Sequence, residues 1–197
     1  DLAIVRNKSA LPVVVPEPSL HCSYQDPKPV AFSNQNVSAA TGPEFAYDFL
    51  FAGLNATTTT LDVMVYEIGL HDARDAFIRL HKAGVTLRVL VSGTTLGSSS
   101  AAENYEAMSE AGIDVRTAAA CYSFAHQKFW VSDNHTAFVA TGNLDHSDFP
   151  DGSDTYPVGS YAYRDFTVRV EGAAVGIFTI LFDAEWANGA KRRPSGL

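Results

Sequence analysis

The sequence predicts an α/β protein with a mixed, mostly parallel β-sheet flanked by helices on both faces. Short β-rich segments alternate with segments whose apolar residues recur at helical spacing. Residues 59–66 are mostly apolar, as expected of a strand that is covered on both sides. The chain has 197 residues, of which 46% are hydrophobic and 18% charged, and this size is sufficient for one buried core.

Each expected element is bounded by residues that favour helix ends or turns. Pro43 and Glu44 suit a first helical turn, because proline loses no hydrogen bond there and an acid faces the positive end of the helix dipole. Gly84 and Gly112 end the next two helices, and residues 133–135 form a hairpin turn. The expected strands are 30–33, 59–66, 85–91, 113–116, 127–132, 136–141 and 166–170, and the expected helices are 43–54, 73–83, 98–111 and 177–188.

One domain with two flanking segments is the expected organisation. Residues 1–27 form an N-terminal extension, because their apolar run is fenced by prolines. Residues 28–190 form the α/β domain, and 191–197 form a basic tail. No apolar run approaches the roughly 20 residues that span a bilayer, and no signal peptide is recognisable. The chain begins at Asp1, so it is expected to be a processed or shortened form or a piece of a longer protein.

The charge, the cysteines and the glycosylation sequons bound the function further. A net charge of −8 argues against a nucleic-acid binder, since such proteins gather Lys and Arg to neutralise phosphates. Cys22 and Cys121 could form one disulfide, although buried thiols are the preferred interpretation. Sequons at Asn36, Asn55 and Asn134 make a secreted or lumenal location possible.

The most informative segment contains His126 and Lys128, two residues apart in an expected strand. Side chains alternate along a strand, so both should point to the same side. A neutral imidazole can attack phosphorus, and an ammonium group beside it offsets the negative charge of a phosphate. The nearby Asn143 can donate a hydrogen bond from its amide to a phosphate oxygen. These residues predict a phosphate site.

The spacing His-x-Lys-x-x-x-x-Asp, from His126 to Asp133, resembles the HKD motif of the phospholipase D superfamily. The segment 140–143 reads Ala-Thr-Gly-Asn, where the superfamily pattern is usually Gly-Ser-x-Asn. Threonine keeps the serine hydroxyl, and glycine allows a close backbone approach. The resemblance covers residues 29–188, including the strand Gly-Val-x-Leu-Arg-Val-Leu-Val and the Arg-Asp-Phe sequence at 164–166.

The resemblance implies a role for each site residue. His126 forms a covalent phosphohistidine, and Lys128 and Asn143 stabilise the phosphate oxygens. Asp165 hydrogen-bonds the far nitrogen of the imidazole and fixes its tautomer; the alternative is an ion pair with Arg164. The implied residues are the catalytic His126, Lys128, Asn143 and Asp165, the substrate-binding Thr141 and Gly142, and Asp133, which holds backbone or a partner cation.

The motif occurs once in the chain, whereas the implied two-step reaction uses two histidines. One ring must be neutral to attack, and another must be protonated to donate to the leaving group. The resemblance therefore implies a homodimer with one composite site, in which two copies face each other. The competing interpretation is one lobe of a longer enzyme that has a second HKD lobe.

The expected function is phosphodiester hydrolysis or transphosphatidylation without a metal or another cofactor. The histidines are scattered, and no Cys, His and Asp cluster has the spacing of metal ligands. A phospholipid or small phosphodiester is favoured, because the chain is acidic and the aromatics of the 145–163 loop lack basic neighbours. An endonuclease, for which nucleic acid would be the substrate, is the first alternative. A non-catalytic phosphate-binding lobe that needs a partner is the second.

Overall fold

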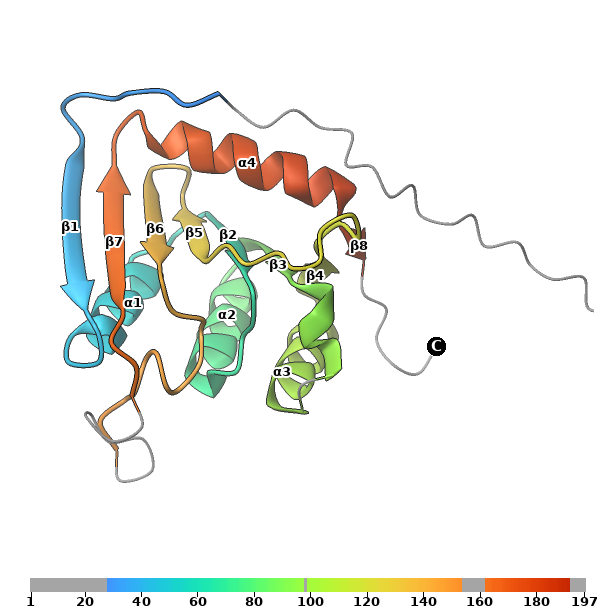
Figure 1. Ribbon diagram of the computed structural model, residues 1–197. Coiled ribbons are helices and arrows are strands. Elements are labelled where there is room, and N and C mark those ends of the chain that lie inside the picture. Colours follow the sequence, from blue (N-terminus) through green and yellow to red (C-terminus); the bar gives the residue numbers. More distant parts are fainter. Residues whose placement is uncertain (1–27, 98, 154–161, 192–197) are drawn as a thin grey trace, which may run out of the picture.

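The computed structural model describes residues 28–97, 99–153 and 162–191, and their strands form a single eight-stranded sheet (Figure 1). The strands lie side by side in the order β1-β7-β6-β5-β2-β3-β4-β8. Their bounds are β1 Asn36–Thr41, β2 Thr60–Val65, β3 Thr86–Val91, β4 Asp114–Thr117, β5 Phe129–Ser132, β6 Thr136–Ala140, β7 Phe166–Glu171 and β8 Ala190–Lys191.

The directions of the strands confirm an α/β protein with a mixed sheet. Strands β2, β3 and β4 run parallel, while the other pairings among the described strands are antiparallel. The parallel part is therefore smaller than expected from the sequence. The reason is that only residues 60–117 repeat the strand–helix–strand pattern that parallel strands need, and the chain then returns through a hairpin.

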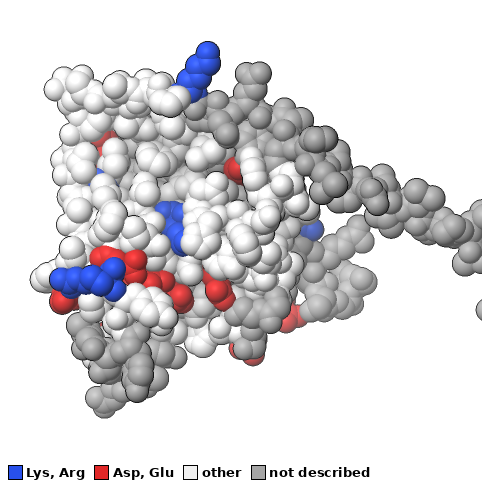
Figure 2. Space-filling model, viewed as in Figure 1, with Lys and Arg blue, Asp and Glu red and all other residues white. Residues whose placement is uncertain are grey.

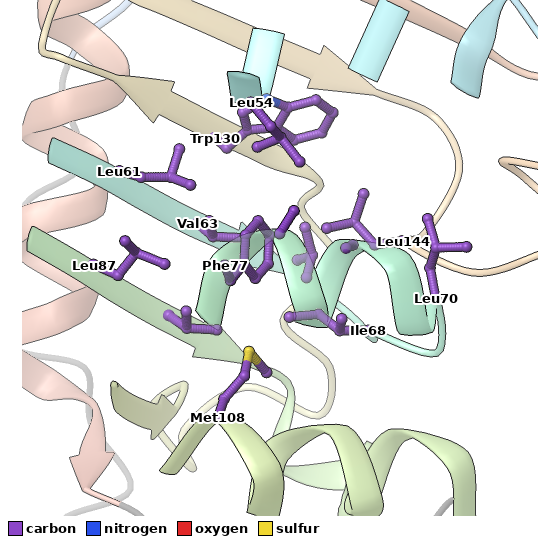
Figure 3. Packing of buried hydrophobic residues seen from close by; sticks show 14 of the residues in the cluster. Leu54, Leu61, Val63, Ile68, Leu70, Phe77, Leu87, Met108, Trp130 and Leu144 are labelled. Carbon is purple, nitrogen blue, oxygen red and sulfur yellow. The ribbon is translucent and has the colours of Figure 1, made fainter. Parts of the chain in front are cut away.

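Three helices cover one face of the sheet, as expected from their apolar stripes. They are α1 Ala46–Asn55, α2 His71–Lys82 and α3 Ser99–Glu110. Figure 3 shows Leu54 beside Trp130 and Phe77 beside Val63, with Met108 at the other end of the same cluster. All five are at most 1% exposed, so they form the centre of the larger core.

The last helix, α4 Val175–Asn188, covers the opposite face (Figure 1). Its Phe182 is fully buried against a second core that includes Leu90 of β3. A partly buried ion-pair network reinforces this contact. Nε and Nη2 of Arg88 each donate to one carboxylate oxygen of Asp62 at 2.7 Å. Nη2 of Arg88 also forms an ion pair with Asp183 of α4 at 2.8 Å.

One edge of the sheet collects the residues that the sequence singled out. Strand β5 begins at Phe129, which pairs with Met64 near the end of β2. Strand β6 ends at Ala140, and its partner β7 begins at Phe166. We call this the carboxyl edge, because β2, β3, β4 and β6 end there. The turn of the β5–β6 hairpin lies at the opposite edge.

The chain ends depart from expectation or lie outside the description. The expected strand at 30–33 is absent, and β1 begins at Asn36 instead. Val30 is 58% exposed and has no strand to pair with. The predicted extension 1–27 and the tail from residue 192 lie outside the described residues, so the domain limits stay predictions. Cys121 is disulfide-bonded, which corrects the preference for free thiols. Cys22, the other cysteine of the sequence, lies outside the described residues.

Candidate active site

His126 and Lys128 lie together at the carboxyl edge, immediately before β5. The Lys128 Nζ atom is 2.8 Å from Nδ1 of His126 and 3.4 Å from its Nε2. An ammonium group donates and cannot accept, so the nearer ring nitrogen carries a lone pair. The imidazole is exposed, whereas Lys128 is only 8% exposed. The exposed ring is therefore open to a ligand and is in contact with a buried cation.

The backbone explains why the two side chains share one side. Although β5 begins at Phe129, the Ala140 amide donates to the Lys128 carbonyl at 2.9 Å and continues the ladder. The chain is therefore held extended through Lys128, as the alternation of a strand requires.

Tyr66 supports the imidazole and was not singled out from the sequence. Its ring centroid lies 4.8 Å from that of His126, and the Lys128 Nζ lies 5.8 Å from the centre of the Tyr66 ring. Tyr66 directly follows β2, so the sequence could have placed it at the carboxyl edge, and this was the one signal that it belongs to the site.

Burial and acidic neighbours act in opposite directions on Lys128. Burial lowers the pKa of this ammonium group, because the charged form loses its hydration. The carboxyl groups of Asp148 and Asp165 raise the pKa and partly offset that effect. A phosphate entering the site would supply the anionic partner that the buried ammonium needs.

Asn143 is positioned by the loop that follows β6. The next residue, Leu144, is 1% exposed and bridges to Ile68 after β2, and it anchors the loop. The backbone amide of Asn143 donates to Oδ2 of Asp148 at 2.6 Å. Its side-chain Oδ1 is buried without a hydrogen-bond partner among the described residues. Asp148, which the sequence analysis missed, is 4% exposed.

Asp165 does not meet His126 as expected. The Thr141 hydroxyl donates to Oδ1 of Asp165 at 2.6 Å, and the Asp165 carboxyl group also interacts with that of Asp148 and raises its pKa. The described hydrogen bonds of the His126 ring go to Lys128 instead. The alternative is not observed either, because Arg164 pairs with Glu44 at 2.7 Å. The packing of Thr141 and Asp148 around Asp165, which spacing cannot reveal, accounts for the difference.

Asp133 lies at the hairpin turn, at the edge opposite to the other site residues. Its carboxylate accepts hydrogen bonds from the backbone amides of residues 58–60 at 2.7–3.2 Å. The hydroxyls of Thr58 and Thr59 donate to it as well. Burial raises the pKa of Asp133, but these hydrogen bonds outweigh it and hold the pKa well below the ordinary value. The residue ties the hairpin to the start of β2.

A cavity of about 260 Å³ opens beside the His126 loop, at the ends of β3 and β4. A larger one, of about 390 Å³, lies between α1 and the hairpin turn, away from His126. The smaller cavity is lined by small or hydroxyl-bearing residues without a charge, namely Ser92, Gly93, Thr94, Thr117, Ala118, Ala119, Ala120, Tyr122, Ser123 and Ala125.

The described residues contain no group of three or more His, Cys, Asp or Glu side chains arranged to hold a metal ion. None of their helices combines the length and apolar character needed to cross a bilayer.

Comparison with known families agrees with the geometry. Residues 50–155, more than half of the chain, match the model of a family described as cardiolipin synthase, PLD-like domain. The chain belongs to the phospholipase D superfamily. This membership places it among phosphodiesterase-type proteins. No curated protein matches the sequence.

Solved structures show the same superfamily fold. Nuc of Salmonella typhimurium, a phospholipase D family member, superposes with a TM-score of 0.69 at 16% identity, over 81% of this chain and 99% of Nuc. NucT of Helicobacter pylori gives 0.65 at 10% identity, over 81% and 100% of the two chains. Phosphatidylserine synthase of Haemophilus influenzae gives 0.58 at 9% identity, over 80% of this chain and 40% of the synthase.

Proposed function

We propose that this phospholipase D superfamily member hydrolyses phosphodiesters, or transfers their phosphate monoester group (the phosphatidyl group of a phospholipid) to an alcohol, through a phosphohistidine at His126. The lone-pair nitrogen of the neutral His126 ring is released by Lys128 and bonds to phosphorus, and the bond from phosphorus to the leaving oxygen breaks. A second protonated imidazole gives its proton to that oxygen. Water or an alcohol then attacks the phosphohistidine, gives up its proton, and frees the ring. No step of this reaction requires a metal ion.

The observation that carries the proposal is the contact between Lys128 Nζ and His126 Nδ1 at 2.8 Å. It joins an accessible nucleophile to a largely buried cation, and charge placed in such a site stabilises a phosphate transition state more than in water. The amide of Asn143 is a neutral donor for another phosphate oxygen. The hydrogen bonds of Thr141 and the close approach of Gly142 support that turn, so both residues contribute to the proposed binding site.

A second copy of the chain is the proposed source of the second imidazole. The sequence holds one HKD motif, and a two-fold axis at the carboxyl edge would bring two His126 rings into one site. The likeness to Nuc and NucT covers essentially the full length of those chains, as expected for a single-lobe architecture. A second HKD lobe on a longer chain remains the alternative source.

A phospholipid or another small phosphodiester is the proposed substrate class. Acidic groups surround the Asn143 turn, and Arg164 already pairs with Glu44, so a polyanion would meet repulsion. Figure 2 shows acidic and basic atoms gathered at its lower left, with few charges over the rest of that face. Tyr163 and Phe124 near the site are 61% and 60% exposed and offer apolar contact. The uncharged cavity of about 260 Å³ has room for a small head group.

Replacement of His126 tests the proposal directly. In His126→Ala, hydrolysis of bis-p-nitrophenyl phosphate is expected to fall by about 1,000-fold or more, because the nucleophile is lost. His135→Ala is the matched control, since His135 is exposed at the other end of the same hairpin. Wild-type activity is expected to survive EDTA. Full activity of His126→Ala, or a complete loss with EDTA, would contradict the mechanism.

The exposed aromatic side chains also allow an endonuclease, because bases stack on such rings. Rates on phosphatidylcholine vesicles, plasmid and single-stranded DNA separate the two candidates. Faster cleavage of vesicles is expected. Cleavage of DNA alone, abolished in His126→Ala, would establish the alternative. Binding of phosphate without turnover on any substrate would instead indicate the non-catalytic lobe.

A further inference from the structure

Asp148 is a buried acid that the proposed mechanism does not use. It contacts the backbone of the Gly142–Asn143 turn directly. A Cβ atom built on Gly142 would lie 2.6 Å from both Cβ and Cγ of Asp148. Its Oδ2 accepts the Asn143 amide proton at 2.6 Å. The carboxyl group therefore supports the turn that presents Asn143, and it explains why residue 142 is glycine.

The contact between Asp148 and Asp165 requires a proton. Two carboxylates are both acceptors, so a hydrogen bond between them needs one group in the acid form. Asp148 Oδ2 receives the Asn143 amide, and Asp165 Oδ1 receives the Thr141 hydroxyl. Each group therefore has a further oxygen that can take part in sharing a proton. One acid pair thus joins the two sides of the turn from Thr141 to Asn143.

The surrounding charges favour retention of that proton. Burial raises the pKa of Asp148 to about 8, helped by a hydrogen bond from the protonated Asp148 to Asp165 and by the charges of Asp145 and Asp165. The Asn143 amide acts in the opposite direction. Lys128 is a nearby cation, and both carboxyl groups raise its pKa. On the side of the acid pair that faces β1, the neighbouring residue is Gly42, which carries no charge. The Gly42 carbonyl accepts a hydrogen bond from Arg164, and Arg164 forms an ion pair with Glu44.

We propose that Asp148 is a positioning residue, which shares one proton with Asp165 to hold Asn143 at the phosphate site and releases the turn when that proton is lost. Loss of the proton leaves two adjacent anions beside the place of the substrate phosphate. Their repulsion pushes the carboxyl groups apart and also opposes an anionic ligand. The site is therefore active with the pair protonated and weakens as the pH rises through about 8.

Thermal unfolding tests the shared proton without any assay of activity. The pKa of Asp148 in the folded chain, about 8, lies above the ordinary value of 3.8. The folded state therefore binds this proton more tightly than the unfolded state, and stability from this group falls as pH rises between those values. Asp148→Asn keeps the shape, donates to Asp165 and accepts from Asn143. Its Tm is expected to match the wild type near pH 4 and to exceed it at pH 8 by about 4 °C or more.

Asp151→Asn is the matched control, because Asp151 is an exposed acid of the same loop. It is expected to show no gain in Tm that grows with pH. An equal or lower Tm of Asp148→Asn at pH 8, or the same gain in Asp151→Asn, would overturn the shared proton.

The link to the site is tested by the ratio of activity at pH 9 to that at pH 7, with bis-p-nitrophenyl phosphate as the probe. This arm rests on the proposed function. The wild-type ratio is expected to be about one tenth, and that of Asp148→Asn about one half or more. Gly142→Ala, which displaces Asp148 without removing it, is expected to lower kcat at both pH values. Equal ratios in wild type and Asp148→Asn would overturn the link, whereas an active His126→Ala would overturn the proposed function and leave the Tm result standing.

Discussion

Lys128 combines two properties that a purely structural lysine lacks. It is 8% exposed, and its Nζ atom contacts the ring of His126 rather than a carboxylate. Burial lowers its pKa more than Asp148 and Asp165 raise it, so the charged form is disfavoured by folding. Because the pKa is lower in the folded chain, charged Lys128 costs stability at neutral pH, and the cost disappears only as the pH rises towards the ordinary value. The residue is therefore expected to matter for activity and not for stability.

Lys128→Met separates these two roles. Activity on bis-p-nitrophenyl phosphate is expected to fall by about 100–1,000-fold, since one fixed charge on the phosphate is lost. The free energy of unfolding at pH 7, measured with urea, is expected not to decrease. Lys82→Met at the exposed end of α2 is the control, with full activity and a change within about 0.5 kcal/mol. A large loss of stability without loss of activity would refute the assignment.

Single residues of the site differed in how far the sequence could predict them. His126, Lys128 and Asn143 could be selected because a motif places chemically matched groups at short spacing. Asp148 could not, because its role depends on how its loop folds back onto Gly142. The pairing of Asp165 with Thr141 instead of His126 has the same cause.

The hairpin of β5 and β6 carries the site at one end and its own anchor at the other. Asp133 and Asn134 both have positive φ angles, 54° and 53°, which matches the tight turn that joins two antiparallel strands. The Asp133 carboxylate then fastens this turn to the backbone of residues 58–60. The anchor fixes the position of β5 against β2, and with it the position of the segment that bears His126.

Asp133→Asn is expected to destabilise the fold by about 2 kcal/mol at pH 7, because charge-assisted hydrogen bonds are weakened while asparagine still accepts the positive φ. The pKa of Asp133 is depressed in the folded chain. Its contribution is therefore present above the ordinary pKa of about 3.9 and is lost as the pH falls through the folded value. Urea unfolding at pH 7 and pH 2.5 should show a difference that shrinks in acid. Glu110→Gln, at an exposed position, is the control, and an equal difference at both pH values would argue against the anchor.

Most elements could be predicted because their patterns are local. Helices α1 to α3 have apolar stripes, α4 is largely apolar all round, and four of the six residues in each of β2 and β3 are apolar. The sequence did not predict β1 and β8, the two outermost strands of the sheet. β1 is mainly exposed and β8 has two residues, so neither carries an alternating pattern. Both strands exist because a neighbouring strand offers hydrogen bonds, which is a property of the assembled sheet.

At the scale of the whole molecule, the two cores form a scaffold, and the candidate site lies at the carboxyl edge of its sheet. The three helices and α4 pack on opposite faces of the sheet and form one core each. Loops at the carboxyl edge bring together residues that are up to 99 positions apart, from Tyr66 to Asp165. The sequence predicted both helix layers but overestimated the parallel part of the sheet, because strand direction beyond β4 depends on where the hairpin docks.

Mixing variants tests the proposed dimer. If each site needs His126 from two copies, a 1:1 mixture of wild type and His126→Ala, refolded together, should keep about one quarter of the activity rather than about one half. The reason is that random pairing leaves one dimer in four with both imidazoles. Light scattering should give about twice the 21.2 kDa of one chain. A residual activity of one half and a monomeric mass would point to independent chains.

The separation of the hairpin turn from the carboxyl edge has a practical consequence. Asn134 is exposed at the tip of the turn, whereas the imidazole of residue 126 lies beyond the far end of the same hairpin. A glycan, dye or surface tether fixed at that tip would project away from incoming ligand. The turn is thus a suitable attachment position for labelling or immobilising the protein during assays.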